Sequence, residues 1–393
     1  MTELYYDPYD FEIDADPHPV WRRMREDAPL YRNDQHEFWA LSRYEDVATG
    51  LNDWRTYSSA RGTLLELIRN DIQFPPGMMI FEDPPLHGVH RALMARLFTP
   101  RRIAQIEPQV RAYCASSLDP LVGGGRIDFI EHLGSQMPMR VIGMLLGIPE
   151  HDQEELRDAI DAGMSLQEAE GVQGERAPVD QTARFATYIE WRRKNPSDDL
   201  MTELLHARFA DDDGIERTLR DDELLGYIGL LAAAGNETTT RLIGWTAYLL
   251  DRCPDQRRLL AADRSLVPNA IEEILRYEAP SPVQARYVTR DVEVHGTRVP
   301  AGSAVLLLNG SANRDEREFA DADRLDVRRK DIHHLSFGHG IHFCLGASLA
   351  RLEGGVALDE ILARWTEWEI DRERAEMART STVRGWKTLP ARI

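Results

Sequence analysis

The chain has 393 residues, of which 42% are hydrophobic and 29% charged, a composition typical of a globular protein with a sizeable core. Its formal net charge of −19 excludes a general affinity for nucleic acids and anionic membranes, because both are themselves negatively charged. The acidic N-terminus lacks the basic start and apolar stretch of a signal peptide, and no segment reaches the roughly 18 apolar residues of a membrane span, so we expect a cytoplasmic protein without a membrane anchor.

The first elements, over residues 17–80, combine helix, strand and loop. PHPVWRRMRE has the spacing of a helix, whereas APLYRND and EFWALSR alternate as short strands do. Residues 61–80 are expected to form an apolar loop that ends in FPPGMMI. We therefore predict a β-richer part at about residues 17–60.

Helical patterns dominate the next part of the chain. Helices are expected over residues 85–119, 128–146 and 151–170, followed by a surface connection at 172–180. Short strands return over about residues 280–310, and STVRGWKTLPARI at the end is typical of a last hairpin. No linker divides the chain, so we predict one domain over residues 1–393, mainly α with a minor β part.

The longest helix is predicted from Asp221 and Asp222, candidate N-cap residues, to about Cys253, where Pro254 stops it. At about 1.5 Å per residue it is on the order of 45 Å long, enough to cross the domain. Polar residues interrupt its apolar sequence at GNETTT, residues 235–240. The threonine hydroxyls there can bond back to carbonyls one turn earlier, which is an ordinary structural role.

One cysteine lies in an unusual loop, SFGHGIHFCLGASLAR, residues 336–351. The three cysteines are far apart and odd in number, which argues against a disulfide framework, and the loop lacks the second cysteine that a zinc site would use. The helix that follows would stabilise a thiolate, and the glycines give room for a flat ligand. A buried structural Cys344, or a nucleophile paired with His339 or His342, remains an alternative.

FGHGIHFCLGASLAR resembles the haem-binding signature of the cytochromes P-450, with phenylalanine, two glycines, histidine, cysteine, glycine and the closing Ala-Arg in register. The resemblance implies the fold of that family, with a long central helix over a haem. Cys344 would be the thiolate ligand of the iron of haem b, His342 would hydrogen-bond a propionate, and Phe337 would pack beside the thiolate. Gly338 and Gly346 would belong to the same cofactor loop.

AAAGNETTT, residues 232–240, resembles the oxygen-binding groove of the same family. The positions that match are Ala234, Gly235, Glu237 and Thr238. The resemblance implies that Thr238 stabilises the activated oxygen and that Glu237 relays protons to it.

Two further motifs support the resemblance. EEILRYEAP places Glu273 and Arg276 three residues apart, as in the family's Glu-x-x-Arg helix, and the candidate third member of this structural network is Arg329, although Leu325 stands where the family usually has phenylalanine. His87 and Arg91, at i and i+4, together with Arg286 match the family's propionate partners. His90, His333, His334 and His339 match less well, and we expect ordinary surface or loop histidines there.

The implied enzyme is a bacterial monooxygenase that activates O2, with NAD(P)H-derived electrons supplied by a ferredoxin and its reductase. A basic patch for an acidic ferredoxin is expected on the cysteine side, from Arg91, Arg96, Arg101, Arg102 and Arg351. We expect a monomer that does not bind nucleic acid.

The family's substrate pocket maps onto apolar residues of this chain. The candidate lining residues are Leu65, Ile68, Phe74, Met78, Met79, Leu230, Ala233, Val283 and Trp386. They favour a lipophilic substrate such as a terpenoid, a steroid or a fatty acid. A peroxide-driven haem oxygenase and a non-catalytic haem protein that binds a ligand are the alternatives.

Overall fold

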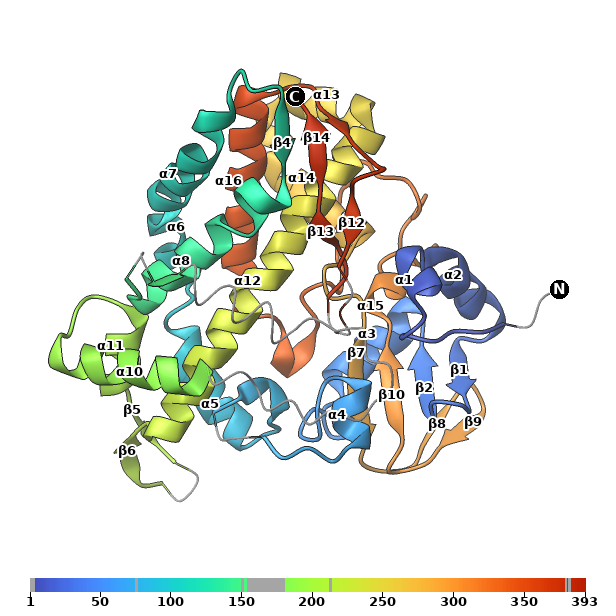
Figure 1. Ribbon diagram of the computed structural model, residues 1–393. Coiled ribbons are helices and arrows are strands. Elements are labelled where there is room, and N and C mark those ends of the chain that lie inside the picture. The colour runs from blue at the N-terminus through green and yellow to red at the C-terminus, as the bar shows by residue number, and fades with distance from the viewer. Residues whose placement is uncertain are drawn as a thin grey trace.

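The computed structural model describes residues 4–74, 77–149, 152–153, 181–211, 214–378, 380 and 383–393, and Figure 1 shows a mainly helical molecule with small sheets. Most of the predicted helix 151–170 and the connection at 172–180 lie outside the described residues. The α-helices are α1 (Phe11–Ala15), α2 (His18–Asp27), α3 (Tyr44–Asn52), α4 (Leu65–Arg69), α5 (Leu86–Ala95), α6 (Pro100–Gln105), α7 (Glu107–Leu118), α8 (Met137–Leu146), α10 (Gln181–Lys194), α11 (Leu200–His206), α12 (Asp221–Arg252), α13 (Pro254–Ala262), α14 (Val267–Tyr277), α15 (Asn309–Ala312) and α16 (Ala347–Arg364).

Short helical turns and strands complete the described part of the chain. The turns are η1 (Met79–Phe81), η2 (Asp119–Leu121), η3 (Ile130–Gly134, a π-helix), η4 (Arg264–Leu266) and η5 (Gly340–His342). The strands are β1 (Leu30–Asn33), β2 (Phe38–Leu41), β3 (Tyr57–Ser58), β4 (Arg126–Asp128), β5 (Arg208–Ala210), β6 (Glu216–Thr218), β7 (Gln284–Val288), β8 (Val292–Val294), β9 (Thr297–Val299), β10 (Ala304–Leu307), β11 (Glu369–Ile370), β12 (Glu376–Met377), β13 (Trp386–Thr388) and β14 (Pro390–Arg392).

The largest sheet joins the two β-richer parts that the sequence predicts. Its strand order is β1-β2-β10-β7-β3, with β2 and β10 parallel and the other neighbours antiparallel. Leu306 of β10 lies opposite Ala40 on one side and Ala285 on the other. All three side chains are buried in the core that also contains Trp21 of α2. The early strands are therefore stabilised by strands that follow them by more than 220 residues.

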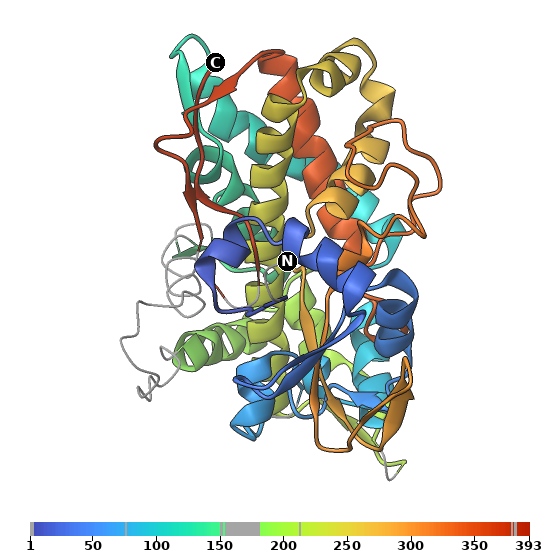
Figure 2. The ribbon, with the colours of Figure 1, turned by 90° about the vertical axis from the view of Figure 1, so that its right-hand side faces the viewer.

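Helix α12 runs the length of the molecule beside α16 in both views (Figures 1 and 2). The helix begins at Asp221, but its N-cap residue is Arg220, so the prediction that Asp221 or Asp222 caps the helix is wrong. The two aspartates lie in the first turn, where a carboxylate interacts favourably with the helix dipole. The helix ends before Pro254, as predicted.

Two other predictions are wrong. Residues 61–80 contain α4 and η1 instead of forming a continuous loop, because Leu65 and Ile68 of α4 bury their side chains in the core beside the largest sheet. The last two strands do not pair as a hairpin. Strand β13 pairs with β12, whereas β14 lies between β11 and β4, which buries Ala391.

A buried carboxylate connects both ends of the chain. Glu278 lies 3.0 Å from His18 Nε2 and 2.8 Å from Arg314 Nη2, and it also binds Arg384. Burial opposes ionisation, but these three neighbours hold the pKa of Glu278 well below its usual range. Among the described residues, no helix is long and apolar enough to cross a membrane.

Candidate active site

The Cys344 loop is held closed between η5 and α16 by its own main chain. The amide of Cys344 donates to the carbonyl of Phe337 at 2.7 Å. Gly340 has a φ of +69°, and a Cβ at this position would lie 2.9 Å from Asn52 Oδ1 and 3.1 Å from the carbonyl of Leu51. Only glycine fits there, since any side chain would meet the backbone of α3.

The thiol of Cys344 is accessible to solvent although protein surrounds it closely. Burial raises its pKa, while the amide of Gly346 and the guanidinium groups of Arg91 and Arg351 oppose that rise. Phe337 packs beside the loop, with Arg351 4.6 Å above its ring. We infer from this combination of enclosure and exposure that the thiol faces an internal hollow.

Four donor side chains from α5, β7 and the cysteine loop gather at one corner of this hollow. The rings of His87 and His342 are 4.3 Å apart, and the Nε2 atom of each is buried without a hydrogen-bond partner in the described structure. Arg286 is 4% exposed and donates to the carbonyl of Ala285, and Arg91 donates to the carbonyl of Phe343. Buried nitrogen atoms without partners are rare in native proteins and point to a missing ligand.

The electrostatics of this corner favour an anion. Burial, with the nearby His87, Arg286 and Arg91, lowers the pKa of His342 to about 3. Burial also lowers the pKa of Arg286 to about 10, with Asp83 as the opposing charge. A ligand with two carboxylates would neutralise the cations and accept hydrogen bonds from the histidines. The residues present therefore fit a haem, whose propionates would lie here and whose iron would face Cys344.

Helix α12 presents a short accessible surface in the middle of its buried length. Ala234 is exposed and Thr238 is half-buried. The two residues on either side of Thr238, Glu237 and Thr239, are buried. Thr238 Oγ1 donates to the carbonyl of Ala234 at 2.9 Å, the back-bond one turn earlier that the sequence predicts as a structural role. Gly235 lies close to α8, where an added Cβ would be 3.1 Å from Ile142.

The carboxylate of Glu237 is tied to its own helix. Arg241 Nη2 donates to Glu237 Oε1 at 2.7 Å, and Arg241 Nη1 donates to the carbonyl of Trp386. Glu237 Oε2 is buried and has no partner among the described residues. Arg241 escaped the sequence analysis, although its i,i+4 spacing from Glu237 is a usable signal for an ion pair.

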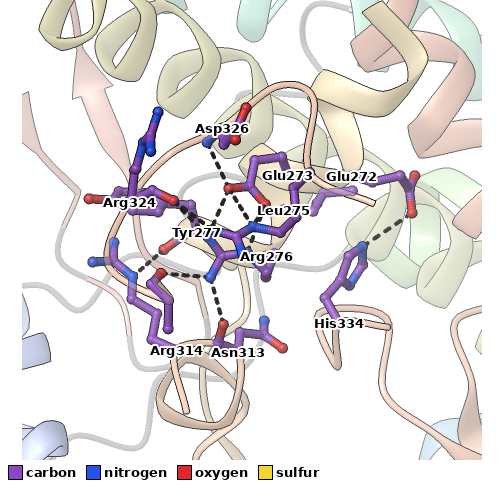
Figure 3. A network of polar contacts seen from close by, with 12 residues as sticks. Glu272, Glu273, Leu275, Arg276, Tyr277, Asn313, Arg314, Arg324, Asp326 and His334 are labelled. Atoms are coloured by element: carbon purple, nitrogen blue, oxygen red, sulfur yellow. Dashed lines mark hydrogen bonds and ion pairs between the residues drawn. The ribbon is translucent and has the colours of Figure 1, made fainter. Parts of the chain in front are cut away.

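The structure brings Glu273, Arg276 and Arg329 together in a buried network, part of which Figure 3 shows. Arg276 and Glu273 are both 0% exposed and form two hydrogen bonds of 2.7 and 2.8 Å. Arg329 Nε lies 3.0 Å from Glu273 Oε2. Arg276 also donates to the main-chain carbonyls of Asn313 and Ala322, so one guanidinium organises the segment that leads to the cysteine loop.

Asn313 carries this order into the cysteine loop. Its side chain donates to Ser336 Oγ at 2.7 Å and accepts from the amide of Leu335 at 2.6 Å. Ser336 in turn donates to the carbonyl of Leu275 on α14. These hydrogen bonds hold the first residues of the loop in place. No local sequence pattern marks Asn313, because its partners are more distant in the chain.

We expect Glu273→Leu to destabilise the fold by about 3–5 kcal/mol, because two arginines would remain buried without their carboxylate. The free energy of unfolding from urea titration measures this loss. The matched control is Glu190→Ala, which removes an exposed i,i+3 pair with Arg193 and should cost at most about 0.5 kcal/mol. Equal effects of the two variants would contradict a structural role for the buried network.

The candidate substrate residues do not all meet in one cavity of the described structure. Leu65 and Val283 line a cavity of about 60 Å³, which also contacts Arg384. Ile68 packs beside the sheet, and Phe74 stacks on Phe81. The other members belong to or pack against the helical core, with the exception of Met78, which is half-buried. These are Met79, Leu230, Ala233 and Trp386.

Two histidines expected at the surface or in loops are buried, so that prediction is wrong for them. His90 is 0% exposed and its Nδ1 lies 2.8 Å from Glu82 Oε2. His334 is 9% exposed and lies 3.3 Å from Glu272, which also pairs with Arg351. Both pair with a carboxylate, and that compensation is what permits their burial.

Known proteins resemble this chain in sequence and in fold. The family model described as Cytochrome P450 matches residues 126–390. Cytochrome P450 130 of Mycobacterium tuberculosis is 37% identical over 390 residues, which cover 96% of this chain and 95% of that protein. Cytochrome P450 monooxygenase PikC of Streptomyces venezuelae is 35% identical over 386 residues, with coverages of 96% and 91%. A crystal structure of CYP109E1 from Bacillus megaterium in complex with testosterone has a TM-score of 0.84 at 31% identity and covers 98% of this chain and 99% of that one.

Proposed function

Because the chain belongs to the cytochrome P450 family, we propose that Cys344 is the thiolate ligand of its haem iron and that the enzyme hydroxylates a lipophilic small molecule. Membership of the family makes the protein a haem-thiolate monooxygenase that uses O2 and takes its electrons from outside. The observation that carries the assignment of Cys344 is the pair of partnerless nitrogen atoms, on His87 and His342, beside an enclosed yet accessible thiol.

The cofactor in this proposal is haem b, held without a covalent bond. His87, Arg91, Arg286 and His342 would bind its propionates, and the amide of Gly346 would stabilise the thiolate. When bound, the haem supplies the reductive activation of O2, the transfer of one oxygen atom to the substrate and the release of the other as water. Glu273, Arg276 and Arg329 hold the loop and take no part in the chemistry.

Glu237 and Thr238 are the proposed proton-handling residues. Thr238 exposes its hydroxyl on the accessible face of α12 and can hold a proton there. Glu237 offers one oxygen, Oε2, because Arg241 occupies the other. A peroxide-driven enzyme would not need Glu237 and Thr238 for this purpose, because hydrogen peroxide supplies both oxygen atoms already at the peroxide oxidation level.

The proposed substrate is terpenoid, steroid or fatty-acid-like. The support is the apolar set around Leu230, Met79 and Trp386, together with the testosterone complex of the similar CYP109E1. A screen of lipophilic compounds for the spin-state shift that follows displacement of water from the iron tests this class. A shift with at least one class, followed by detection of a hydroxylated product, is expected. A shift without product in a reduced, aerated system would favour the non-catalytic haem protein.

We also propose a ferredoxin, served by an NAD(P)H-dependent reductase, as the electron donor. Three of the five arginines expected in its docking patch are engaged: Arg102 with Glu203, Arg351 with Glu272, and Arg91 with the main chain of Phe343. Arg96 and Arg101 are exposed, and α6, which carries Arg101, packs against α16 behind the cysteine loop. These two side chains are the best remaining contacts for an acidic partner.

We expect Arg101→Glu to slow reduction by an acidic ferredoxin about tenfold at low salt, because charge pairs across such an interface mainly accelerate association. Stopped-flow measurement of haem reduction reports this rate. The control Arg298→Glu changes the same charge on β9, on the sheet side of the molecule, and should leave the rate unchanged. A tenfold loss that persists at high salt would contradict an electrostatic contact.

The remaining parts of the proposal concern organisation. We propose a single domain over residues 1–393, since the largest sheet and the Glu278 network each join early and late segments. We propose a cytoplasmic monomer, which fits the three free cysteines.

A further inference from the structure

His90 and Glu82 form a buried histidine–carboxylate pair beside the proposed propionate site. The family motifs do not identify either residue. His90 Nδ1 is 2.9 Å from Glu82 Oε1 and 2.8 Å from Glu82 Oε2. The side chains are 1% and 10% exposed respectively. Because a carboxylate only accepts, Nδ1 carries the proton and donates it to Glu82.

Glu82 contacts three different segments. Its Oε1 also accepts from the amide of Gly77 at 3.3 Å, and its main chain lies beside the imidazole of His342 in the cysteine loop. Gly77 is itself packed against α12, where a Cβ would lie 2.6 Å from the carbonyl of Glu223. Glu82 therefore connects the segment after residue 76 to α5 and to the cysteine loop.

His90 is fixed on its other side by aromatic contacts. Its ring meets Tyr227 of α12 edge-on at 5.6 Å and Phe209 of β5 at 6.3 Å. His90 is one turn from His87 and adjacent to Arg91, the two proposed propionate partners on α5. The N-cap residue of α5, Pro85, makes no side-chain hydrogen bond to the helix, whereas the Glu82–His90 pair ties the fifth residue of α5 to the segment that precedes the helix.

We propose that Glu82 and His90 are positioning residues for the haem, a clasp that holds His87 and Arg91 of α5 against His342 of the cysteine loop. The proposal rests on the proposed function, because it assumes that these three residues bind the propionates. The clasp touches neither substrate nor iron. It acts by keeping the two halves of the propionate site, which come from segments more than 240 residues apart and meet at the His87–His342 and Arg91–Phe343 contacts, at one separation.

The test is the rate at which the ferric protein loses haem to an excess of apomyoglobin. Glu82→Met keeps the side-chain length without the acceptor, and His90→Phe keeps the ring that packs on Tyr227 without the donor. Each is expected to lose haem about tenfold faster than the wild type, because a buried polar group is left without its partner. The double variant should lie within about twofold of the faster single variant, as expected of two groups that act as one unit.

Two further variants separate positioning from general destabilisation. Glu82→Gln keeps an acceptor oxygen for Nδ1 and should lose haem at no more than about twice the wild-type rate. His36→Phe is the matched control, since it breaks a 3.0 Å contact with Asp7 and keeps a ring that meets Tyr9 edge-on, in a different part of the chain. Its haem loss should match that of the wild type.

The outcomes separate the clasp from the function it rests on. Wild-type rates in both Glu82→Met and His90→Phe would overturn the clasp, as would equal acceleration by His36→Phe or additive effects in the double variant. If Glu82→Met does not accumulate as folded protein, His90→Phe carries the same comparison. A wild-type protein without the thiolate-shifted band of its reduced carbon monoxide adduct would overturn the proposed function and the clasp together.

Discussion

Cys344→Ser is expected to abolish the thiolate-shifted band of the reduced carbon monoxide adduct and to lower substrate oxidation by more than about a hundredfold. Loss of residues that merely support a metal ligand costs roughly 10–100-fold, so loss of the ligand itself should cost more. Serine occupies the same space, but its hydroxyl stays protonated where the amide of Gly346 and two arginines stabilise a thiolate. The absorbance spectrum and the rate of product formation measure the two effects.

The chain supplies its own controls for this experiment. Cys253 is half-buried at the end of α12, and Cys114 is buried in α7. Cys253→Ser should keep both the band and the rate, because its side chain lies outside the hollow that Cys344 faces. Retention of the band in Cys344→Ser would show that another residue binds the iron, and the assignment of the cysteine loop would then fall.

The parts of the site that residue spacing alone predicts are those whose residues lie close together in the chain, whereas Arg286 and Arg329 are expected only from the family resemblance. The cysteine loop, the polar interruption of α12 and the Glu273–Arg276 spacing each lie within one element or turn. Their chemistry depends on local geometry, such as a helix N-terminus beside Cys344, and local geometry can be inferred from spacing. The central helix follows in the same way from one long helical segment that ends before Pro254.

The contacts that the sequence does not predict join segments far apart in the chain. Arg241 meets the carbonyl of Trp386 across 145 residues, and β14 pairs with β4 although β13 is its neighbour in sequence. No local pattern distinguishes these partners from others of the same chemistry. His90 is a different case, because Glu82 is only eight residues away, but a histidine on an amphipathic helix has the same appearance whether Glu82 or water accepts its proton.

The second large effect concerns the proton-handling residues. Glu237→Gln and Thr238→Ala should each lower product formation with reductase-supplied electrons by about 10²-fold, the range that a lost acid–base group typically costs. Glutamine is the informative replacement at Glu237, because its amide oxygen can still accept from Arg241 while the group can no longer release a proton. The ratio of product formed to electrons consumed, measured with NADPH oxidation, should fall with the rate.

A control on the same helix makes the interpretation of Thr238→Ala specific. Thr246 Oγ1 donates to the carbonyl of Leu242 at 2.7 Å, as Thr238 Oγ1 does to Ala234 at 2.9 Å, but Thr246 is buried and Thr238 is half-buried on the accessible face. Thr246→Ala therefore removes the same back-bond without touching the hollow and should keep its ratio of product to electrons. Peroxide-supported turnover should also survive in Thr238→Ala, since peroxide needs no delivered proton to reach its oxidation level. Equal losses in Thr238→Ala and Thr246→Ala would mean that the hydroxyl of Thr238 only stabilises the helix. A wild-type enzyme that turns over as fast with peroxide as with reductase would instead favour the peroxide-driven enzyme.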